Sequence, residues 1–124
     1  MSTRTPLARV EGLGSAHSGV GHFWRQRVTA TALAPLSIWF AWLAFSLIGE
    51  GRGEAVAFLK MPVNAVLMAL FIIAATVHMA LGIQVVIEDY IEREGAKIIL
   101  LMLNQFAAWI VAAAALFALV KIVL

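Results

Sequence analysis

The sequence predicts an all-α membrane protein with three transmembrane helices, from its composition, the spacing of its charges and the placement of its basic residues. Of the 124 residues, 63% are hydrophobic and only 13% are charged, whereas soluble domains are about half apolar and about a quarter charged. Charge-free stretches cover residues 28–49, 61–87 and 98–120. At ~1.5 Å per residue, each can cross a hydrocarbon core of ~30 Å. We therefore expect spans at about 28–49, 62–87 and 98–121.

Lysine and arginine are unevenly distributed around these spans. Six lie before the first span or between the second and third: Arg4, Arg9, Arg25, Arg27, Arg93 and Lys97. The other three are Arg52, Lys60 and Lys121. Because basic residues are enriched on the cytoplasmic side, the N-terminus is predicted to be cytoplasmic and the C-terminus to lie on the opposite side. The net charge of +2 is scattered around the spans, so we expect no nucleic-acid partner.

Residues 1–22 are predicted to form a cytoplasmic tail, and residues 23–124 the membrane domain. The tail contains Pro6, several glycines and no apolar run, so a cleaved signal peptide is not expected. Its small polar residues bury little surface, which favours a segment that is mobile or docked on a partner. His17 and His22 fall in this tail. The absence of cysteine from the sequence excludes disulfides and thiolate metal sites.

The two connections between the spans differ in length and chemistry. Gly49, Gly51 and Gly53 end the first helix, and Pro62 suits the first position of the second, where a missing N–H has no cost. The second connection, residues 88–97, is shorter and highly charged. A link this short predicts that the second and third helices pack as an antiparallel pair.

His78 lies well inside the second predicted span, and an ionisable residue at that depth is a functional hypothesis by default. Helical periodicity places Ala75 and Gly82 beside it and Asp89 on the same face at the membrane surface. Small neighbours leave room for a flat macrocycle whose iron binds the imidazole. Two alternatives stay open: a neutral histidine hydrogen-bonded to a neighbouring helix, and a glycine that only permits close helix approach. If haem is bound, its second axial ligand must come from another chain.

Asp89 and Tyr90 end the second helix, and Arg25 and Arg27 are expected at the N-terminus of the first. The phenol of Tyr90 can donate a hydrogen bond to a carbonyl at the membrane surface, or it can serve as an ordinary interfacial aromatic residue. Asp89 can orient that phenol, pass protons or remain a solvated loop acid. An arginine at a helix N-terminus would favour a carboxylate such as a haem propionate, whereas the alternative is contact with lipid phosphates.

The motif H-x3-G in the second of three helices, followed by DY eleven residues after the histidine, resembles the hydrophobic membrane-anchor subunits of succinate dehydrogenase, respiratory complex II. The segment SGVGHFWRQRVTA before the first span is similar to the same family. The resemblance implies that His78 is an axial ligand of haem b, with Gly82 beside the haem. It also implies that Tyr90 donates a hydrogen bond to ubiquinone, with Asp89 next to it, and that Arg27 contacts a propionate or the quinone site.

The resemblance further implies a role and partners. The chain would tether a flavoprotein subunit and an iron–sulfur subunit to the bacterial inner membrane, with the mitochondrial inner membrane as the alternative. It would share its haem with a cytochrome b556 subunit, and electrons would pass from succinate to ubiquinone. No nucleophile–base pair or phosphate-binding loop occurs in the sequence. We therefore expect no catalysis by this chain alone.

Three alternatives remain at this point. The anchor of a fumarate reductase would run the electrons in the reverse direction. A haem-free structural membrane subunit would use His78 only for packing. A small transporter would place Asp89 on a proton path, although coupling acids are expected near the membrane midplane and Asp89 lies at a helix end.

Overall fold

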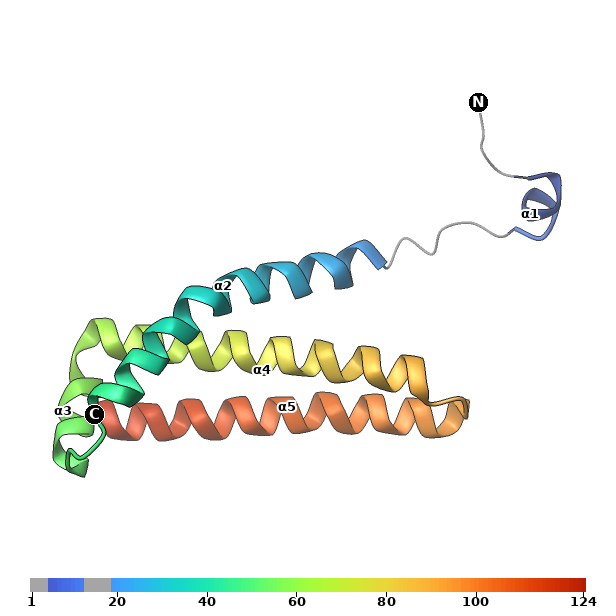
Figure 1. Ribbon diagram of the computed structural model, residues 1–124. Coiled ribbons are helices and arrows are strands. Elements are labelled where there is room, and N and C mark those ends of the chain that lie inside the picture. Colours follow the sequence, from blue (N-terminus) through green and yellow to red (C-terminus); the bar gives the residue numbers. More distant parts are fainter. Residues whose placement is uncertain (1–4, 13–18) are drawn as a thin grey trace.

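The fold consists of helices only within residues 5–12 and 19–124, the part of the chain that the computed structural model describes. Three helices are long and apolar enough to cross a membrane: α2 (Gly19–Ser46), α4 (Pro62–Tyr90) and α5 (Glu94–Val123). Two short helices, α1 (Pro6–Val10) and α3 (Arg52–Lys60), complete the described chain (Figure 1). The predicted all-α fold with three membrane-spanning helices is confirmed.

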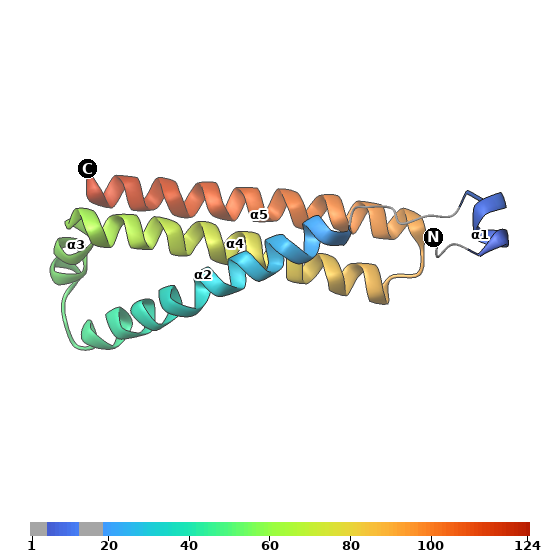
Figure 2. The ribbon, with the colours of Figure 1, turned by 90° about the horizontal axis from the view of Figure 1, so that it is seen from above.

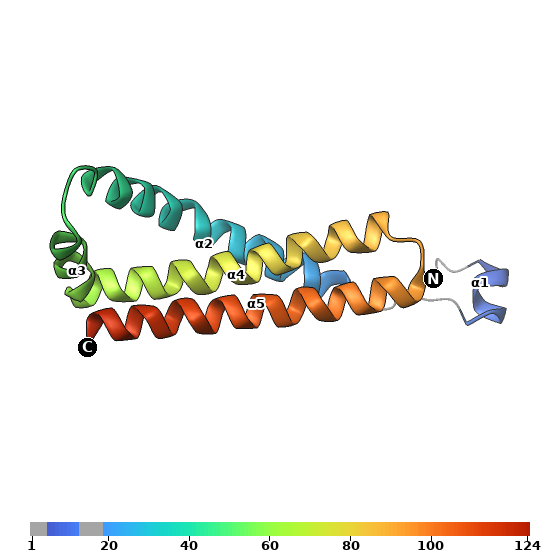
Figure 3. The ribbon, with the colours of Figure 1, turned by 90° about the horizontal axis from the view of Figure 1, so that it is seen from below.

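Helices α4 and α5 lie side by side and antiparallel over most of their length, as the short connection predicted (Figure 3). Pro62 occupies the start of α4, and α5 carries Glu94 in its first turn and Lys121 in its last, which complements the helix dipole. At the connection, Lys97 Nζ donates a hydrogen bond of 2.9 Å to the carbonyl of Glu88. Deeper in the pair, Asn104 Nδ2 donates one of 2.8 Å to the carbonyl of Ala80.

Helix α2 runs across α4 at a clear angle, and among the described residues its backbone packs on α4 and not on α5 (Figure 2). It begins at Gly19, inside the segment assigned to the tail and well before residue 28, and it ends at Ser46. Residues 19–27 carry arginines that are unsuited to hydrocarbon but favourable in a helix. The charge-free window therefore located the apolar span, whereas the helix itself extends beyond that window.

The connection between α2 and α4 contains the helix α3, which glycine and proline positions did not predict. Gly49 adopts a left-handed backbone, with φ of 85°, and turns the chain after α2. Glu54 in the first turn and Lys60 in the last favour α3 through the helix dipole. Asn64 Nδ2 then donates a hydrogen bond of 3.0 Å to the carbonyl of Phe58, and the Phe58 ring lies 6.1 Å from that of Trp42.

The interior of the bundle is thin. Among the described residues the buried ones are Leu43, Thr76, Ala80, Leu81, Ala108 and Leu119. Many large apolar side chains are exposed instead, including Trp109 at 62% and Phe117 at 71%. These apolar side chains suit contact with lipid or with other membrane helices, because they have no polar groups that require water.

Candidate functional site

His78 is half-buried on α4 and faces α2. Its Nδ1 lies 3.0 Å from the hydroxyl Oγ1 of Thr29, which is within hydrogen-bonding distance. The same hydroxyl lies 2.8 Å from the carbonyl oxygen of Arg25 and 3.1 Å from that of Gln26. Among the described residues the imidazole Nε2 has no hydrogen-bond partner. One ring nitrogen of His78 is therefore engaged by the neighbouring helix, and the other is available.

The surroundings of Gly82, one turn from His78, are open. A Cβ atom built on Gly82 meets no atom within 4 Å, so the glycine is not needed here for close packing against another helix of this chain. Ala75, one turn away in the other direction, is half-buried. The residues fit a flat group lying against α4 next to the imidazole, since the space is open and a ring nitrogen is available.

Within residues 5–12 and 19–124, no three His, Cys, Asp or Glu side chains gather into a group able to hold a bare metal ion. A haem makes a smaller demand on the chain. The porphyrin supplies four ligands to the iron, so a single imidazole from one chain can serve as an axial ligand. The single imidazole of His78 meets this smaller demand, whereas it could not hold a bare metal ion by itself.

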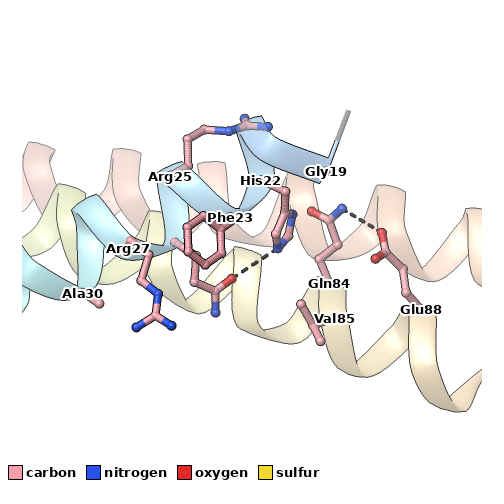
Figure 4. Close-up of a pocket in the computed structure, with 10 residues that line it drawn as sticks. Gly19, His22, Phe23, Arg25, Arg27, Ala30, Gln84, Val85 and Glu88 are labelled. Carbon is pink, nitrogen blue, oxygen red and sulfur yellow. Dashed lines mark hydrogen bonds between the residues drawn. The ribbon is translucent and has the colours of Figure 1, made fainter. Parts of the chain in front are cut away.

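A cleft of about 810 Å³ opens between the first turns of α2 and the last turns of α4 (Figure 4). Its lining combines backbone at Gly19 with polar and charged side chains from both helices: His22, Arg25, Gln26, Arg27, Gln84 and Glu88. His22 Nε2 lies 3.2 Å from Gln26 Oε1 along α2, and Gln84 Nε2 donates a hydrogen bond of 2.8 Å to Glu88 Oε1 along α4. Phe23, Ala30 and Val85 add apolar surface, so the cleft combines polar and apolar groups at the end of the bundle where α2 begins.

The position of the two arginines corrects the expectation that they stand at the helix N-terminus. The first four N–H groups of α2 belong to residues 19–22, and Arg25 and Arg27 lie beyond them. Both nevertheless line the cleft together with Gly19. Arg25 Nε donates a hydrogen bond of 3.3 Å to the carbonyl of Gly21, and the guanidinium of Arg27 lies 5.2 Å from the centre of the Phe23 ring. Figure 4 shows the two side chains pointing away from each other.

Asp89 and Tyr90 are the last two residues of α4, at the same end of the bundle as the cleft (Figure 1). Both are exposed, and Tyr90 is 79% exposed. The described residues include no hydrogen-bond partner for the Tyr90 phenol, and Asp89 does not contact it through a hydrogen bond. The structure therefore does not join Tyr90 and Asp89 to His78 within this chain.

Several site residues were not predicted from the sequence. Thr29, Gln84 and Glu88 were not singled out, and His22, placed in the tail by the sequence analysis, belongs to the first turn of α2. His17 lies outside the described residues. Extending the first helix beyond the charge-free window would have placed His22, Arg25 and Thr29 along one face, because they are spaced by three and four residues. No sequence signal pairs Thr29 with His78.

The comparisons with known proteins agree with this architecture. The family model described as succinate dehydrogenase/fumarate reductase transmembrane subunit matches residues 1–119. The chain is 35% identical over 117 residues to the succinate dehydrogenase hydrophobic membrane anchor subunit of Paracoccus denitrificans, covering 94% of this chain and 90% of the relative. The subunit of the same name from Rickettsia conorii is 31% identical over 105 residues, covering 82% of each chain. No solved structure matches.

Three spans and bacterial relatives identify a multi-pass bacterial membrane protein. The family match covers almost the whole chain, and the relatives are covered along most of their own length. The chain therefore belongs to the family of succinate dehydrogenase/fumarate reductase transmembrane subunits, and within it to the hydrophobic membrane anchor subunits.

Proposed function

We propose that this chain provides half of a haem b site and part of a ubiquinone site in a bacterial succinate dehydrogenase. It tethers a flavoprotein subunit and an iron–sulfur subunit to the inner membrane and pairs with a cytochrome b556 subunit. The N-terminus faces the cytoplasm, and electrons from succinate leave on ubiquinone. The observation that carries the proposal is the His78 imidazole, with Nδ1 engaged by Thr29 and Nε2 available next to the open space at Gly82.

His78 would hold the haem iron through its Nε2, and a residue of the partner subunit would supply the other protein ligand. Gly82 leaves room for the porphyrin against the helix. Bound there, haem b supplies a one-electron redox centre inside the membrane. Arg27 and Arg25, which line the cleft at the start of α2, offer positive charge to the haem carboxylates. Such charge-assisted hydrogen bonds are about twice as strong as neutral ones.

Tyr90 acts at the membrane surface. Its exposed phenol, which has no partner among the described residues of the chain, donates a hydrogen bond to a quinone oxygen. As the quinone accepts electrons, negative charge develops on that oxygen, and a donor already in place stabilises it. Asp89, also exposed and adjacent in sequence, orients the quinone site or supplies protons from the cytoplasm.

The deciding experiment is the reduced-minus-oxidised spectrum of the purified complex, wild type beside His78→Ala. We expect the b-type band to disappear in the variant. Thr76→Val is the matched control, because Thr76 is buried on the same helix and its hydroxyl donates only to the carbonyls of Ile72 and Ile73. Its spectrum should equal that of the wild type.

Two other outcomes have defined meanings. If His78→Ala prevents assembly, His78→Met keeps an iron ligand and should assemble with a shifted haem spectrum. A His78→Ala complex with an unchanged band, or a wild-type complex without one, would overturn the haem assignment and favour the haem-free structural subunit. A faster reduction of fumarate than oxidation of succinate with the native quinone would favour the fumarate reductase alternative.

A further inference from the structure

We infer that Thr29 positions the haem ligand: its hydroxyl holds His78 in the tautomer that carries the proton on Nδ1 and leaves the Nε2 lone pair for iron. The inference rests on the proposed function, because it assigns a residue of α2 to the haem site there. The proposal uses the contact between Thr29 and His78 only as an observation, whereas the inference gives Thr29 a role in holding the ligand.

The Thr29 hydroxyl has three neighbours and one proton. Its Oγ1 lies 2.8 Å from the carbonyl oxygen of Arg25, 3.1 Å from that of Gln26 and 3.0 Å from His78 Nδ1. A hydroxyl has one donor and two acceptor positions, whereas a backbone carbonyl can only accept. The contact with the carbonyl of Arg25 therefore requires the hydroxyl proton. Without it, two oxygen atoms would face each other at 2.8 Å with only lone pairs between them.

Once the proton is directed to the carbonyl, the contact with His78 must be donated by the ring. Nδ1 then carries the hydrogen, and a neutral imidazole with Nδ1–H has its lone pair on Nε2. The opposite tautomer would direct two lone pairs at each other across 3.0 Å. The chain thus selects, before any cofactor binds, the tautomer that a ligand through Nε2 needs.

The contact also orients the ring. It is the one side-chain hydrogen bond between α2 and α4 among the described residues, and both side chains are half-buried. The hydrogen bond restrains rotation of the imidazole about its bond to Cβ. In metal sites, partners of this kind raise the basicity of the ligand, and their loss typically weakens metal binding by about 10- to 100-fold.

The test compares three variants of the assembled complex. Thr29→Val removes the hydroxyl at nearly constant volume, Thr29→Ser keeps it, and Thr31→Val is the control. Thr31 lies on the same helix, and its hydroxyl donates a hydrogen bond of 2.9 Å to the carbonyl of Arg27 but none to a histidine. The readouts are haem content per complex, the electron paramagnetic resonance spectrum of the ferric haem and its reduction potential.

We expect Thr29→Val to weaken haem retention by about 10- to 100-fold, to change the ferric resonance and to raise the reduction potential, because a less basic imidazole stabilises ferric iron less. Thr29→Ser and Thr31→Val should match the wild type. Haem content, resonance and potential that are all unchanged in Thr29→Val, with the band still lost in His78→Ala, would overturn this inference alone. A band retained in His78→Ala would overturn the proposed function.

Assembly provides one more discriminating result. If Thr29→Val and Thr29→Ala both fail to assemble while His78→Ala assembles, Thr29 acts on folding and not through the histidine, and the inference is wrong. If only Thr29→Ala assembles, haem content and reduction potential are measured on that variant instead. Haem content should fall and the potential should rise, and unchanged values would overturn the inference.

Discussion

Thr29 Oγ1 on α2 lies 3.0 Å from His78 Nδ1 on α4, between residues that are 49 positions apart in the sequence. This contact joins α2, whose first turns carry the arginines that line the cleft, to α4, which carries the histidine. A polar contact inside the membrane has few competitors, because neither lipid tails nor bulk water offers a partner there. The relationship between these two residues connects the fold of the chain with its proposed haem site.

Substitution of Tyr90 by phenylalanine should impair quinone reduction and leave succinate oxidation intact. Only the hydroxyl is lost, and a hydrogen bond to a charged oxygen contributes about 1.5–3 kcal/mol, which corresponds to roughly 10- to 100-fold in rate. The measurement compares ubiquinone reduction with reduction of a soluble dye by the same complex. Equal rates for wild type and Tyr90→Phe with ubiquinone would leave Tyr90 as an interfacial aromatic residue.

Gly82→Ala tests whether the glycine makes room for the porphyrin or only permits close approach of another helix. A Cβ at this position meets no atom within 4 Å, and alanine is favoured over glycine in helices by about 1 kcal/mol, so the helix itself should tolerate the change. If the space serves the porphyrin, haem content should fall, and Gly82→Phe should lower it further. Gly95→Ala, at the start of α5 with equally open surroundings, is the control. Full haem content in Gly82→Phe would contradict the prediction.

Arg27→Gln should lower the reduction potential of the haem. A positive charge near the haem carboxylates stabilises the ferrous state relative to the ferric state, so its removal lowers the potential. The change in potential should be smaller at high salt, because the Arg27 side chain is exposed. Potentiometric titration measures it, with Arg27→Lys expected to restore most of the potential. The same change at Arg25 provides the comparison. A shift confined to Arg25→Gln would transfer the role from Arg27 to Arg25.

Asn104→Ala should loosen the α4–α5 pair by a modest amount. The Asn104 side chain donates a hydrogen bond of 2.8 Å to the carbonyl of Ala80. Hydrogen bonds between membrane helices contribute about 0.6 kcal/mol to stability on average. Thermal unfolding of the detergent-solubilised complex should therefore begin at a slightly lower temperature. Gln105→Ala, at the next and exposed position, should have no effect. A larger loss for Gln105→Ala than for Asn104→Ala would refute the assignment.

The orientation in the membrane can be measured by cysteine labelling, because the chain contains no cysteine of its own. Glu54→Cys in α3 should react with a membrane-impermeant maleimide in intact cells. Glu92→Cys, between α4 and α5, should stay unlabelled in intact cells and react once the cell membrane has been permeabilised. The distribution of basic residues predicts this result. Labelling of Glu92→Cys in intact cells would reverse the proposed orientation.

The sequence by itself determined the class of the protein, the number of its spans and the place of His78 within the second of them. These properties depend on composition along the chain, since a helix must satisfy its own backbone groups in lipid wherever charges are absent for long enough. It also predicted the antiparallel α4–α5 pair, because a short connection leaves no other arrangement. The true start of α2 at Gly19 and the helix α3 were not predicted, because helices can continue through polar residues outside the hydrocarbon.

Only the tertiary structure decided which side chains meet. The packing of α2 on α4 and not on α5 among the described residues depends on the angle at which the helices cross, and this angle follows from side-chain packing over the whole contact. The pairing of Thr29 with His78 follows from that crossing. A threonine among the small residues of α2 has no distinguishing pattern in the sequence, and its importance depends on which ring nitrogen lies opposite its hydroxyl.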